Sequence, residues 1–285
     1  MAFDHGRKDH DKRLRAGRRI TGSDTKFVAP DDTGRLLEAV IRKGDRVCLE
    51  GDNQKQAKFL AEQLAAVDSR QVHDLHLVQS SVVLDEHVEL FRRGIADRLD
   101  FAYAGPQAKQ LYDAAAAKQV KIGAIHTYLE LYARYLMDLA PKVSLVVAEA
   151  CDLEGNLFTG FNTEDTPMIC EATHFRSGIV IAEVKEQRTN LPRTDIPHDW
   201  VDFIVVTGED AYVQPLFTRN PAHITDMQIL MAMMTIKGIY HEYGVRSLNH
   251  GIGYPTAAIE LLLPTFGRKL HMKGKRCTHW VLNPH

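Results

Sequence analysis

The sequence predicts an α/β protein built on an open, mostly parallel sheet with flanking helices. From residue 46 onward, short apolar and β-branched runs alternate with stretches of helical period, the pattern of parallel strands joined by crossover helices. Several runs are apolar enough to be covered on both faces. The composition is that of a globular chain, with 45% hydrophobic and 25% charged residues among 285.

The individual elements follow from these patterns. A surface helix is expected over Asn53–Ala66, where Ala57, Leu60, Ala61 and Leu64 form one apolar stripe. A methionine-rich helix over Ile224–Tyr243 is expected to end at Gly244. Strands are expected over Arg46–Glu50, His73–Gln79, Asp100–Tyr103, Lys121–Ile125, Val143–Ala148, Ile179–Val184 and Phe203–Val206.

Three regions are expected along the chain. Residues 1–34 form a basic N-terminal tail with little to bury, either solvated or contacting an acidic partner. Residues 35–222 form the main domain, and residues 223–285 begin a second one after a linker at Pro215–Pro221. A second unit of this size is marginal for a core of its own. We therefore expect a truncated chain, or a unit that leans on its neighbour.

Charge and cysteine content exclude several classes of partner. The 35 Lys and Arg residues are balanced by 37 Asp and Glu residues, so neither nucleic acid nor an anionic membrane is an expected partner. The four cysteines lack the spacing of a zinc site or a disulfide framework. No metal is expected. No apolar window suits a membrane span or a signal peptide, which favours a cytoplasmic protein.

Three predicted strands end in loops that suit a ligand. Gly51, Asp52 and Asn53 lie between a strand and a helix, where unpaired amides attract phosphate or carboxylate, although Asp52 or Asn53 also suits a helix cap. Gly105 and Gln107 follow the strand that ends at Tyr103, and His126 follows the strand after it. Because ligands gather at the carboxyl ends of parallel strands, we expect His126 to face solvent and substrate. A lone histidine is also compatible with a hydrogen-bonded structural role.

Two further loops carry polar residues and glycines. Asn249, His250, Gly251 and Gly253 precede a helix, and amides exposed by the two glycines would stabilise a developing oxyanion. A tight structural turn is the alternative. The loop over residues 152–165, which includes Asn162, has the composition of a turn and matches no calcium loop.

Taken in order, these loops resemble those of the coenzyme A transferase superfamily. The chain is similar to the malonate decarboxylase α subunit family from about residue 35 to the end. The similar segments are Val47–Gln56, Gly123–Leu131, Asn162–Pro167, Leu191–Pro197 with Trp200–Phe203, and Leu248–Gly253. The resemblance implies a coenzyme A transferase-like fold and a transferase that exchanges acetyl for malonyl on an acyl carrier protein. Separate decarboxylase subunits then act on the malonyl thioester.

The resemblance also implies how substrates bind. The phosphoribosyl-dephospho-coenzyme A arm of the carrier, or coenzyme A, is a substrate, and no cofactor is permanently bound. Malonate attacks the thioester carbonyl to give a mixed anhydride, and acetate leaves when the thiolate returns. His126 stands where the superfamily places a glutamine donor, with Gly251 and Gly253 as oxyanion donors. The remaining residues that we expect to bind substrate or the thioester arm are Gly51, Asp52, Asn53, Gly105, Gln107, Asn162, Asn249 and His250. His126 and the 251–253 bend are expected to line one hollow.

The chain departs from the superfamily in one respect. Residues 276–285 contain no carboxylate where classical members carry a nucleophilic glutamate, and Glu260 is expected to be structural. No nucleophile is assigned. The open alternatives are a coenzyme A transferase of the citrate lyase α type that uses another dicarboxylate, and a non-catalytic assembly fragment. The isolated chain is expected to have little transferase activity. Arg193, Arg219 and Arg246 are either carboxylate clamps or solvated surface residues.

Overall fold

The chain divides into two compact units, Met1–Gln214 and Pro215–His285. The structure is a computed structural model that describes residues 2–22, 25–49, 55–160, 166–213, 219–272 and 276–277. The division falls a few residues before the boundary expected at residue 222. Each unit has an apolar core of its own.

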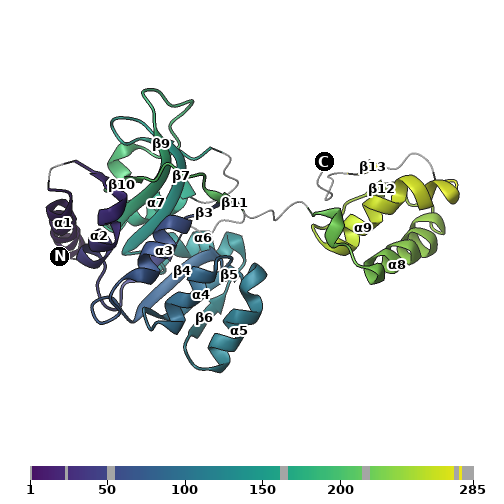
Figure 1. The fold of residues 1–285 in the computed structure, drawn as a ribbon, viewed down its shortest axis with the longest axis horizontal. Helices are drawn as coiled ribbons and strands as arrows, with labels where there is room; N and C mark the ends of the chain where they lie inside the picture. The colour runs from purple at the N-terminus through teal and green to yellow at the C-terminus, as the bar shows by residue number, and fades with distance from the viewer. Residues whose placement is uncertain are drawn as a thin grey trace. The chain divides into compact units, whose positions relative to one another are not determined.

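One sheet organises the first unit, and its main strands all pair in parallel (Figure 1). Only the short β8 (Leu157–Phe158) joins antiparallel, on β7. The predicted α/β class with a mostly parallel sheet is confirmed. Across the sheet the order is β1 (Phe27–Val28), β10 (Phe203–Val206), β9 (Ile179–Gln187), β7 (Val143–Cys151), β2 (Arg46–Leu49), β4 (Leu75–Ser81), β5 (Ala96–Tyr103) and β6 (Lys121–Ile125).

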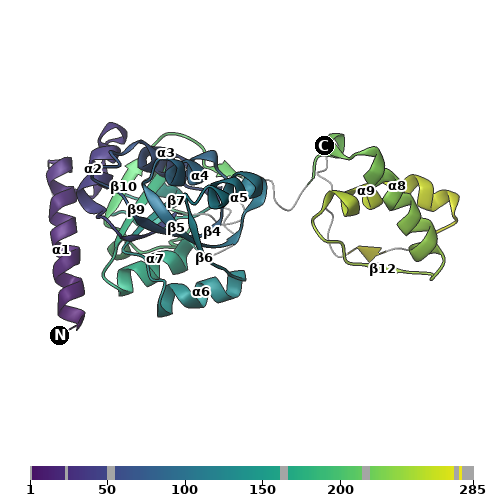
Figure 2. The ribbon, with the colours of Figure 1, turned by 90° about the horizontal axis from the view of Figure 1, so that it is seen from below.

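Helices cover both faces of this sheet, as Figure 2 shows. One face carries α2 (Thr33–Val40), α3 (Lys58–Ala66), α4 (Asp85–Arg92) and α5 (Ala108–Ala116), and the other carries α6 (Tyr128–Met137) and α7 (Thr166–Phe175). Neighbouring strand residues alternate between the two apolar cores: Val47 belongs to the first and Cys48 to the second. Short 3-10 turns lie at Pro30–Asp32, Gly105–Gln107, His198–Trp200 and Pro221–His223.

The start of the helix expected over Asn53–Ala66 is wrong. Residues Lys55–Gln56 form the strand β3, which pairs antiparallel with β11 (Tyr212–Val213), and α3 begins only at Lys58. The predicted apolar stripe is real from Leu60 onward. Pairing with a strand distant in sequence overrides the local helical pattern, which single-sequence periodicity cannot detect.

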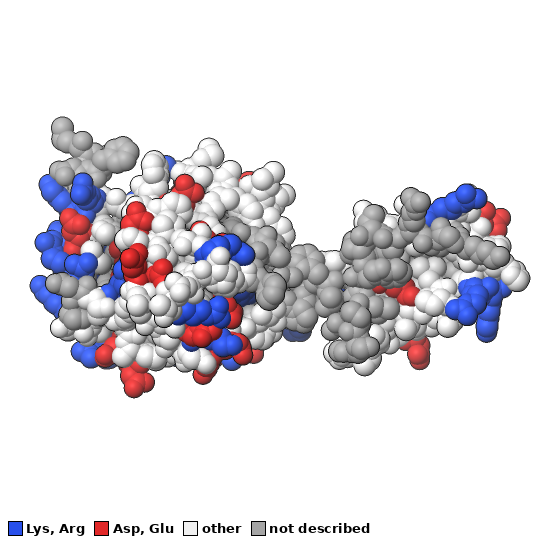
Figure 3. Space-filling view, turned by 90° about the horizontal axis from the view of Figure 1, so that it is seen from above, with Lys and Arg blue, Asp and Glu red and all other residues white. Residues whose placement is uncertain are grey.

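The N-terminal segment is a helix, α1 (Ala2–Thr21), and the expectation that it has nothing to bury is wrong. Arg13 is 4% exposed and donates to the carbonyl of Val40 and to both carboxylate oxygens of Asp45. A Cβ at Gly17 would stand 2.3 Å from Phe203 Cζ. The contact of α1 with the rest of the unit thus depends on the guanidinium of Arg13 and on Gly17. Counting the apolar residues of the segment does not detect such a contact. The exposed side of α1 is basic, as Figure 3 shows.

The second unit packs two helices and a short strand pair. The predicted methionine-rich helix is confirmed as α8 (Asp226–Thr235), which a capping box at Thr225 begins and a π-helical turn (Ile236–His241) extends. Gly244, at φ 59°, follows its end. β12 (Ser247–Leu248) leads into α9 (Tyr254–Leu262) and a second π-helical turn (Leu263–Gly267), and pairs in parallel with β13 (Arg276–Cys277). No helix in the described ranges is long and apolar enough to cross a membrane.

Candidate functional site

The strand order reverses at β2, which marks one edge of the sheet as the place for a ligand. From β2 the chain runs outward through β4, β5 and β6, then returns to the other side of β2 with β7. Ligands of open parallel sheets bind outside the carboxyl ends of the strands at such a reversal. The loop with Gly51, Asp52 and Asn53 follows β2 at this edge, and these three residues lie outside the described ranges.

A buried lysine directly follows this loop. Lys55 is 4% exposed, and its Nζ donates to the carbonyl oxygen of Thr159. Thr159 is fixed in turn, because its amide and hydroxyl donate to Asp195 Oδ2 over 2.9 and 2.8 Å. A buried cation beside the strand reversal is suited to hold a carboxylate. Sequence reasoning missed Lys55, although a lysine inside the polar run 50–56 was the available signal.

A buried carboxyl group, that of Glu183, lies at the first turn of α3. Glu183, in the middle of β9, accepts the amide hydrogen of Leu60 at Oε2 over 2.7 Å. This takes the place of a side-chain cap, which Ala57 cannot provide. Burial raises the pKa of Glu183 to about 8, against the lowering effect of the Leu60 and Phe59 amides. Sequence reasoning also missed this residue, a glutamate within an otherwise apolar strand.

His126 follows β6, as expected, but its side chain turns away from solvent. The side chain is 1% exposed, and Nε2 lies 3.0 Å from Asp100 Oδ1. The expectation that it faces solvent is therefore wrong. His76 Nε2 lies 2.6 Å from the other carboxylate oxygen of Asp100, Oδ2. His126 Nδ1 lies 3.3 Å from Glu130 Oε1, without hydrogen-bond geometry.

Asp100 is the centre of this histidine cluster. Burial acts to raise its pKa, but the hydrogen bonds from His126 and His76 outweigh burial and hold the pKa below its ordinary value. Burial in turn lowers the pKa of His76. An ionised carboxylate only accepts hydrogen bonds, so both Nε2 atoms are the donors. Gly123 makes room for the carboxylate, since a Cβ there would stand 2.2 Å from Asp100 Oδ2.

Gly105 and Gln107 form a tight turn after β5. Gly105 has φ 48°, and a Cβ there would lie 2.9 Å from the ring of Tyr103. Gln107 is buried and donates to Asp85 Oδ1 over 2.8 Å, at the first turn of α4. The contacts of Gln107 are thus structural, and they fix the loop beside the carboxyl end of β5.

The loop after β7 is a turn organised by Asp152. Its Oδ1 accepts the amide hydrogens of Glu154, Gly155 and Asn156 over 3.0, 2.8 and 2.9 Å. Such a carboxylate-centred turn satisfies the backbone without a ligand. This agrees with the turn that the composition indicates. Asn162 lies outside the described ranges.

The glycine loop of the second unit leads into α9 as predicted. Thr256 Oγ1 donates to the carbonyl oxygen of Gly253 over 2.7 Å and also to that of Gly251. This bend holds the loop so that its amides lie at the start of α9, where main-chain donors are left over. Asn249 is exposed, and Gly251 has open space around its Cβ position. Convergence of this bend with His126 stays a prediction.

His250 anchors the glycine loop from inside. Its Nδ1 lies 2.9 Å from Glu260 Oε1 and its Nε2 lies 3.2 Å from the hydroxyl of Tyr240. His250 and Glu260 are both buried. A histidine held on both sides within the core positions the backbone that follows it. Glu260 is structural here, as expected from the sequence.

Of the three arginines considered as carboxylate clamps, Arg193 and Arg219 have local partners. Arg193 forms an ion pair with Asp195 and lies over the ring of Phe158, and Arg219 lies over the ring of Tyr254. Arg246 is exposed. Within the described part of the chain, no group of three His, Cys, Asp or Glu side chains is arranged to hold a metal ion.

Comparison with known proteins assigns the family. A family model described as "Malonate decarboxylase, alpha subunit, transporter" matches residues 2–285. The chain belongs to the malonate decarboxylase alpha subunit family. A relative from Malonomonas rubra named "Acetyl-S-ACP:malonate ACP transferase" is 56% identical over 277 residues, which cover 97% of this chain and 50% of the relative. The chain thus spans about half the length of this curated relative.

Solved structures agree with this assignment. A Pseudomonas malonate decarboxylase hetero-tetramer in complex with malonate contains a chain that is 50% identical, with a TM-score of 0.83 over 98% of this chain and 51% of that one. A malonate decarboxylase alpha subunit from Acinetobacter baumannii is 46% identical, with a TM-score of 0.82 over 99% and 52%. An acyl-CoA transferase from E. coli O157:H7, 16% identical with a TM-score of 0.63 over 85% and 59%, shows the same fold. The fold is therefore coenzyme A transferase-like.

Proposed function

We propose that this chain carries part of a transferase that exchanges acetyl for malonyl on the thioester of an acyl carrier protein, the first step of malonate decarboxylation. The observation that carries the proposal is the 56% identity, over 97% of this chain, with the acetyl-S-ACP:malonate ACP transferase of Malonomonas rubra. The substrates are malonate and the acetyl thioester on the phosphoribosyl-dephospho-coenzyme A arm of the carrier, and no cofactor is permanently bound. The products are acetate and the malonyl carrier.

The reaction divides into two balanced acyl transfers. A malonate carboxylate attacks the acetyl carbonyl, so that a C–O bond forms, the C–S bond breaks and the carrier thiolate leaves. The thiolate then attacks the malonyl carbonyl of the mixed anhydride, a C–S bond forms and acetate leaves. Both steps pass through an oxyanion and depend on holding a weak nucleophile against the carbonyl. Positioned donors and a cation are therefore what the site has to supply.

Particular residues are suited to these tasks. Within the proposal, the buried ammonium of Lys55 holds a malonate carboxylate beside the strand reversal. The amides around Gly251 and Gly253, at the start of α9, stabilise the oxyanion. His126 would reach a thioester only after its Nε2 leaves Asp100, so we assign it a positioning role at the end of β6.

The wider setting is part of the same proposal. The Pseudomonas structure is a hetero-tetramer, which supports decarboxylase subunits as partners of this chain, together with the carrier protein. We place the complex in the cytoplasm. Residues from about 223 onward would begin a second transferase-like domain.

The test follows the acyl group on the carrier by intact-protein mass spectrometry. Acetylated carrier and malonate labelled with carbon-13 at every position are incubated with the assembled complex. We expect the unlabelled acetyl group to be released as acetate while the carrier becomes labelled, as malonyl carrier or, after decarboxylation, as acetyl carrier. Replacing the carrier with acetyl-coenzyme A, or malonate with citrate, separates the coenzyme A transferase and citrate lyase alternatives. A carrier that keeps its unlabelled acetyl group in the presence of an intact complex would support the assembly role and contradict the proposal.

Matched variants locate the chemistry. Lys55→Met should raise the KM for malonate more than it lowers kcat, whereas Lys185→Met, on the exposed end of β9, should leave both within roughly twofold. Gly253→Val should lower kcat, because the added side chain would keep the thioester away from the amides of the loop. Equal rates in Lys55→Met and the control would remove Lys55 from the site.

A further inference from the structure

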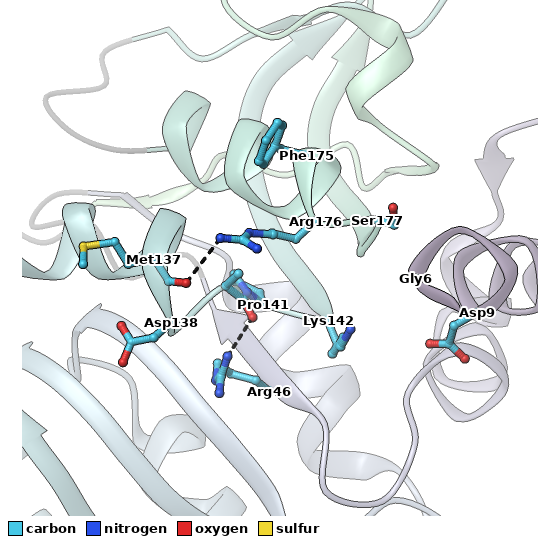
Figure 4. Close-up of a pocket in the computed structure, with 11 residues that line it drawn as sticks. Gly6, Asp9, Arg46, Met137, Asp138, Pro141, Lys142, Phe175, Arg176 and Ser177 are labelled. Atoms are coloured by element: carbon cyan, nitrogen blue, oxygen red, sulfur yellow. Dashed lines mark hydrogen bonds between the residues drawn. The ribbon is translucent and has the colours of Figure 1, made fainter. Parts of the chain in front are cut away.

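A cavity of about 540 Å³ lies at the opposite edge of the sheet from the strand reversal site (Figure 4). Its walls are the amino end of β2 at Arg46, the connection from α6 to β7, the end of α7 and the inner side of α1. The volume is in the range of small-molecule sites. Nothing in the acyl-transfer chemistry uses this edge. Its lining residues are Gly6, Asp9, Arg46, Met137, Asp138, Ala140, Pro141, Lys142, Phe175, Arg176 and Ser177.

Three cations line this cavity, and none of them is neutralised. Among the described residues, no carboxylate lies at ion-pair distance from Arg46, Lys142 or Arg176, and Asp138 acts on Arg46 only from a longer range. Arg46 donates to the carbonyl of Ala140 over 3.0 Å, and Arg176 donates to the carbonyl of Leu136 over 2.7 Å. Both guanidinium groups thus give their hydrogen bonds to main-chain oxygens, and Arg176 also lies over the Phe175 ring, with Cζ 5.9 Å from the centroid.

The two anions in the lining are already paired. Asp9 accepts from Arg13 over 2.8 Å and also from Arg42, while Asp138 accepts from Arg134. Neither Arg13, Arg42 nor Arg134 lines the cavity. The cavity therefore has a net positive field, which the basic outer side of α1 strengthens.

Two details show that Arg46 is partly desolvated and that the guanidinium groups of Arg46 and Arg176 are held in place. Arg46 Nε is buried and has no hydrogen-bond partner, and burial lowers the pKa of Arg46, only partly offset by Asp138. The carbonyls that hold Arg46 and Arg176 both belong to the end of α6 and the connection after it, as Figure 4 shows. A guanidinium anchored on one nitrogen presents its remaining donors in a fixed direction.

We propose that this cavity binds a small molecule carrying a phosphate group or a pair of carboxylates, held by Arg46, Lys142 and Arg176. A multivalent oxyanion matches both the surplus charge and the planar donor groups of arginine. Phe175 and Met137, 62% and 71% exposed at the rim, offer apolar surface to the organic part of such a ligand. The site is separate from the proposed acyl-transfer site, and it does not depend on that function.

The test measures binding of inorganic phosphate, malonate and AMP by calorimetry at constant ionic strength. We expect saturable binding of phosphate, and tighter binding of AMP if its base uses the apolar rim. Lys142→Glu should weaken phosphate binding by roughly tenfold or more, and Lys142→Gln by several-fold. The matched control is Lys109→Glu, an equal charge change at a residue 85% exposed on α5. It should stay within roughly twofold of the wild type.

The outcomes separate the sources of the oxyanion and decide the proposal. Malonate binding that Lys142→Glu weakens belongs to this cavity and extends the ligand class to dicarboxylates. Malonate binding that Lys142→Glu leaves unchanged belongs to another site, so phosphate alone then supports the proposal. Phosphate binding that does not saturate, or that is equal in the wild type and in Lys142→Glu, would overturn it. Lys142 is exposed, so its variants should fold.

Discussion

Glu183 Oε2 accepts the amide hydrogen of Leu60 over 2.7 Å, so a buried carboxyl group of the sheet closes the first turn of α3. This pair joins β9 to the helix that follows the β2 loop. The carboxyl group is protonated over much of the neutral range, because burial raises its pKa to about 8.

Stability should therefore depend on pH through Glu183. The folded state keeps this proton up to about pH 8, while the unfolded chain releases it near 4.5. Stability then falls as pH rises between these values, by up to about 1.4 kcal/mol per pH unit, and levels off above pH 8. Urea unfolding between pH 5 and 9 should show a shallower slope in Glu183→Gln. Glu186→Gln, on the exposed end of the same strand, should keep the wild-type slope; equal slopes in both variants would assign the titration elsewhere.

Gly123→Ala should break the histidine cluster around Asp100. The new Cβ would stand 2.2 Å from Asp100 Oδ2, so the carboxylate must leave His76, His126 or both. We expect a loss of about 1–3 kcal/mol in the free energy of unfolding. Gly34→Ala is the control. Gly34 lies in α2, where alanine stabilises a helix, and the nearest atom to its added Cβ would be Gln63 Oε1 at 3.6 Å. Nitrogen NMR of the two imidazoles would detect the altered hydrogen bonds, and unaltered spectra would contradict the expected displacement.

Arg13→Met should detach α1. Asp45 would lose the guanidinium that contacts both of its oxygens, and breaking a buried pair costs about 3–5 kcal/mol. We expect a value near the lower limit, because water reaches Asp45 once the helix leaves. Arg15→Met, at an exposed position of the same helix, should be nearly neutral. Protease cleavage within residues 2–22 and the urea midpoint measure the two effects; a cleavage rate equal to that of the wild type would show that other contacts hold α1.

Glu260→Ala should loosen the glycine loop of the second unit. It leaves buried His250 without its carboxylate partner, at a cost of about 1–3 kcal/mol. Hydrogen exchange at the Gly251 and Gly253 amides should speed up by roughly tenfold. Glu242→Ala, on the exposed end of the preceding helix, should leave exchange unchanged. If Glu260→Ala also exchanges at the wild-type rate, the loop is held by the Thr256 contacts alone.

Much of the fold follows from the sequence, because buried parallel strands are continuous apolar runs that few other structures produce. The runs at Val143–Ala148 and Ile179–Val184 are strands of the central sheet. The short pairing of Lys55–Gln56 with Tyr212–Val213 was missed, since neither segment has an apolar run and their contact is distant in sequence. The docking of α1 was missed because it depends on Arg13 and Gly17, whose roles appear only when their partners are present.

The candidate site was predictable only in part. Strand ends and glycine loops identify where a ligand binds, and His126 does follow β6. The direction of its side chain was not predictable, because it is set by Asp100, on the neighbouring strand. Lys55 and Glu183 were missed for another reason. Both matter because they are buried, and a sequence does not reveal the burial of a single charged residue.

The pairing of β1 with β10 constrains when the molecule can be completed during synthesis. Phe27 aligns with Ile204 and Val28 with Val205, so β1 has to wait for β10, which is synthesised much later in the chain. Until then α1, whose Arg13 can already reach Val40 and Asp45, lacks the Phe203 ring on which its Gly17 packs. The nascent chain therefore closes this edge of its sheet, and completes the packing of α1 on Phe203, late in synthesis.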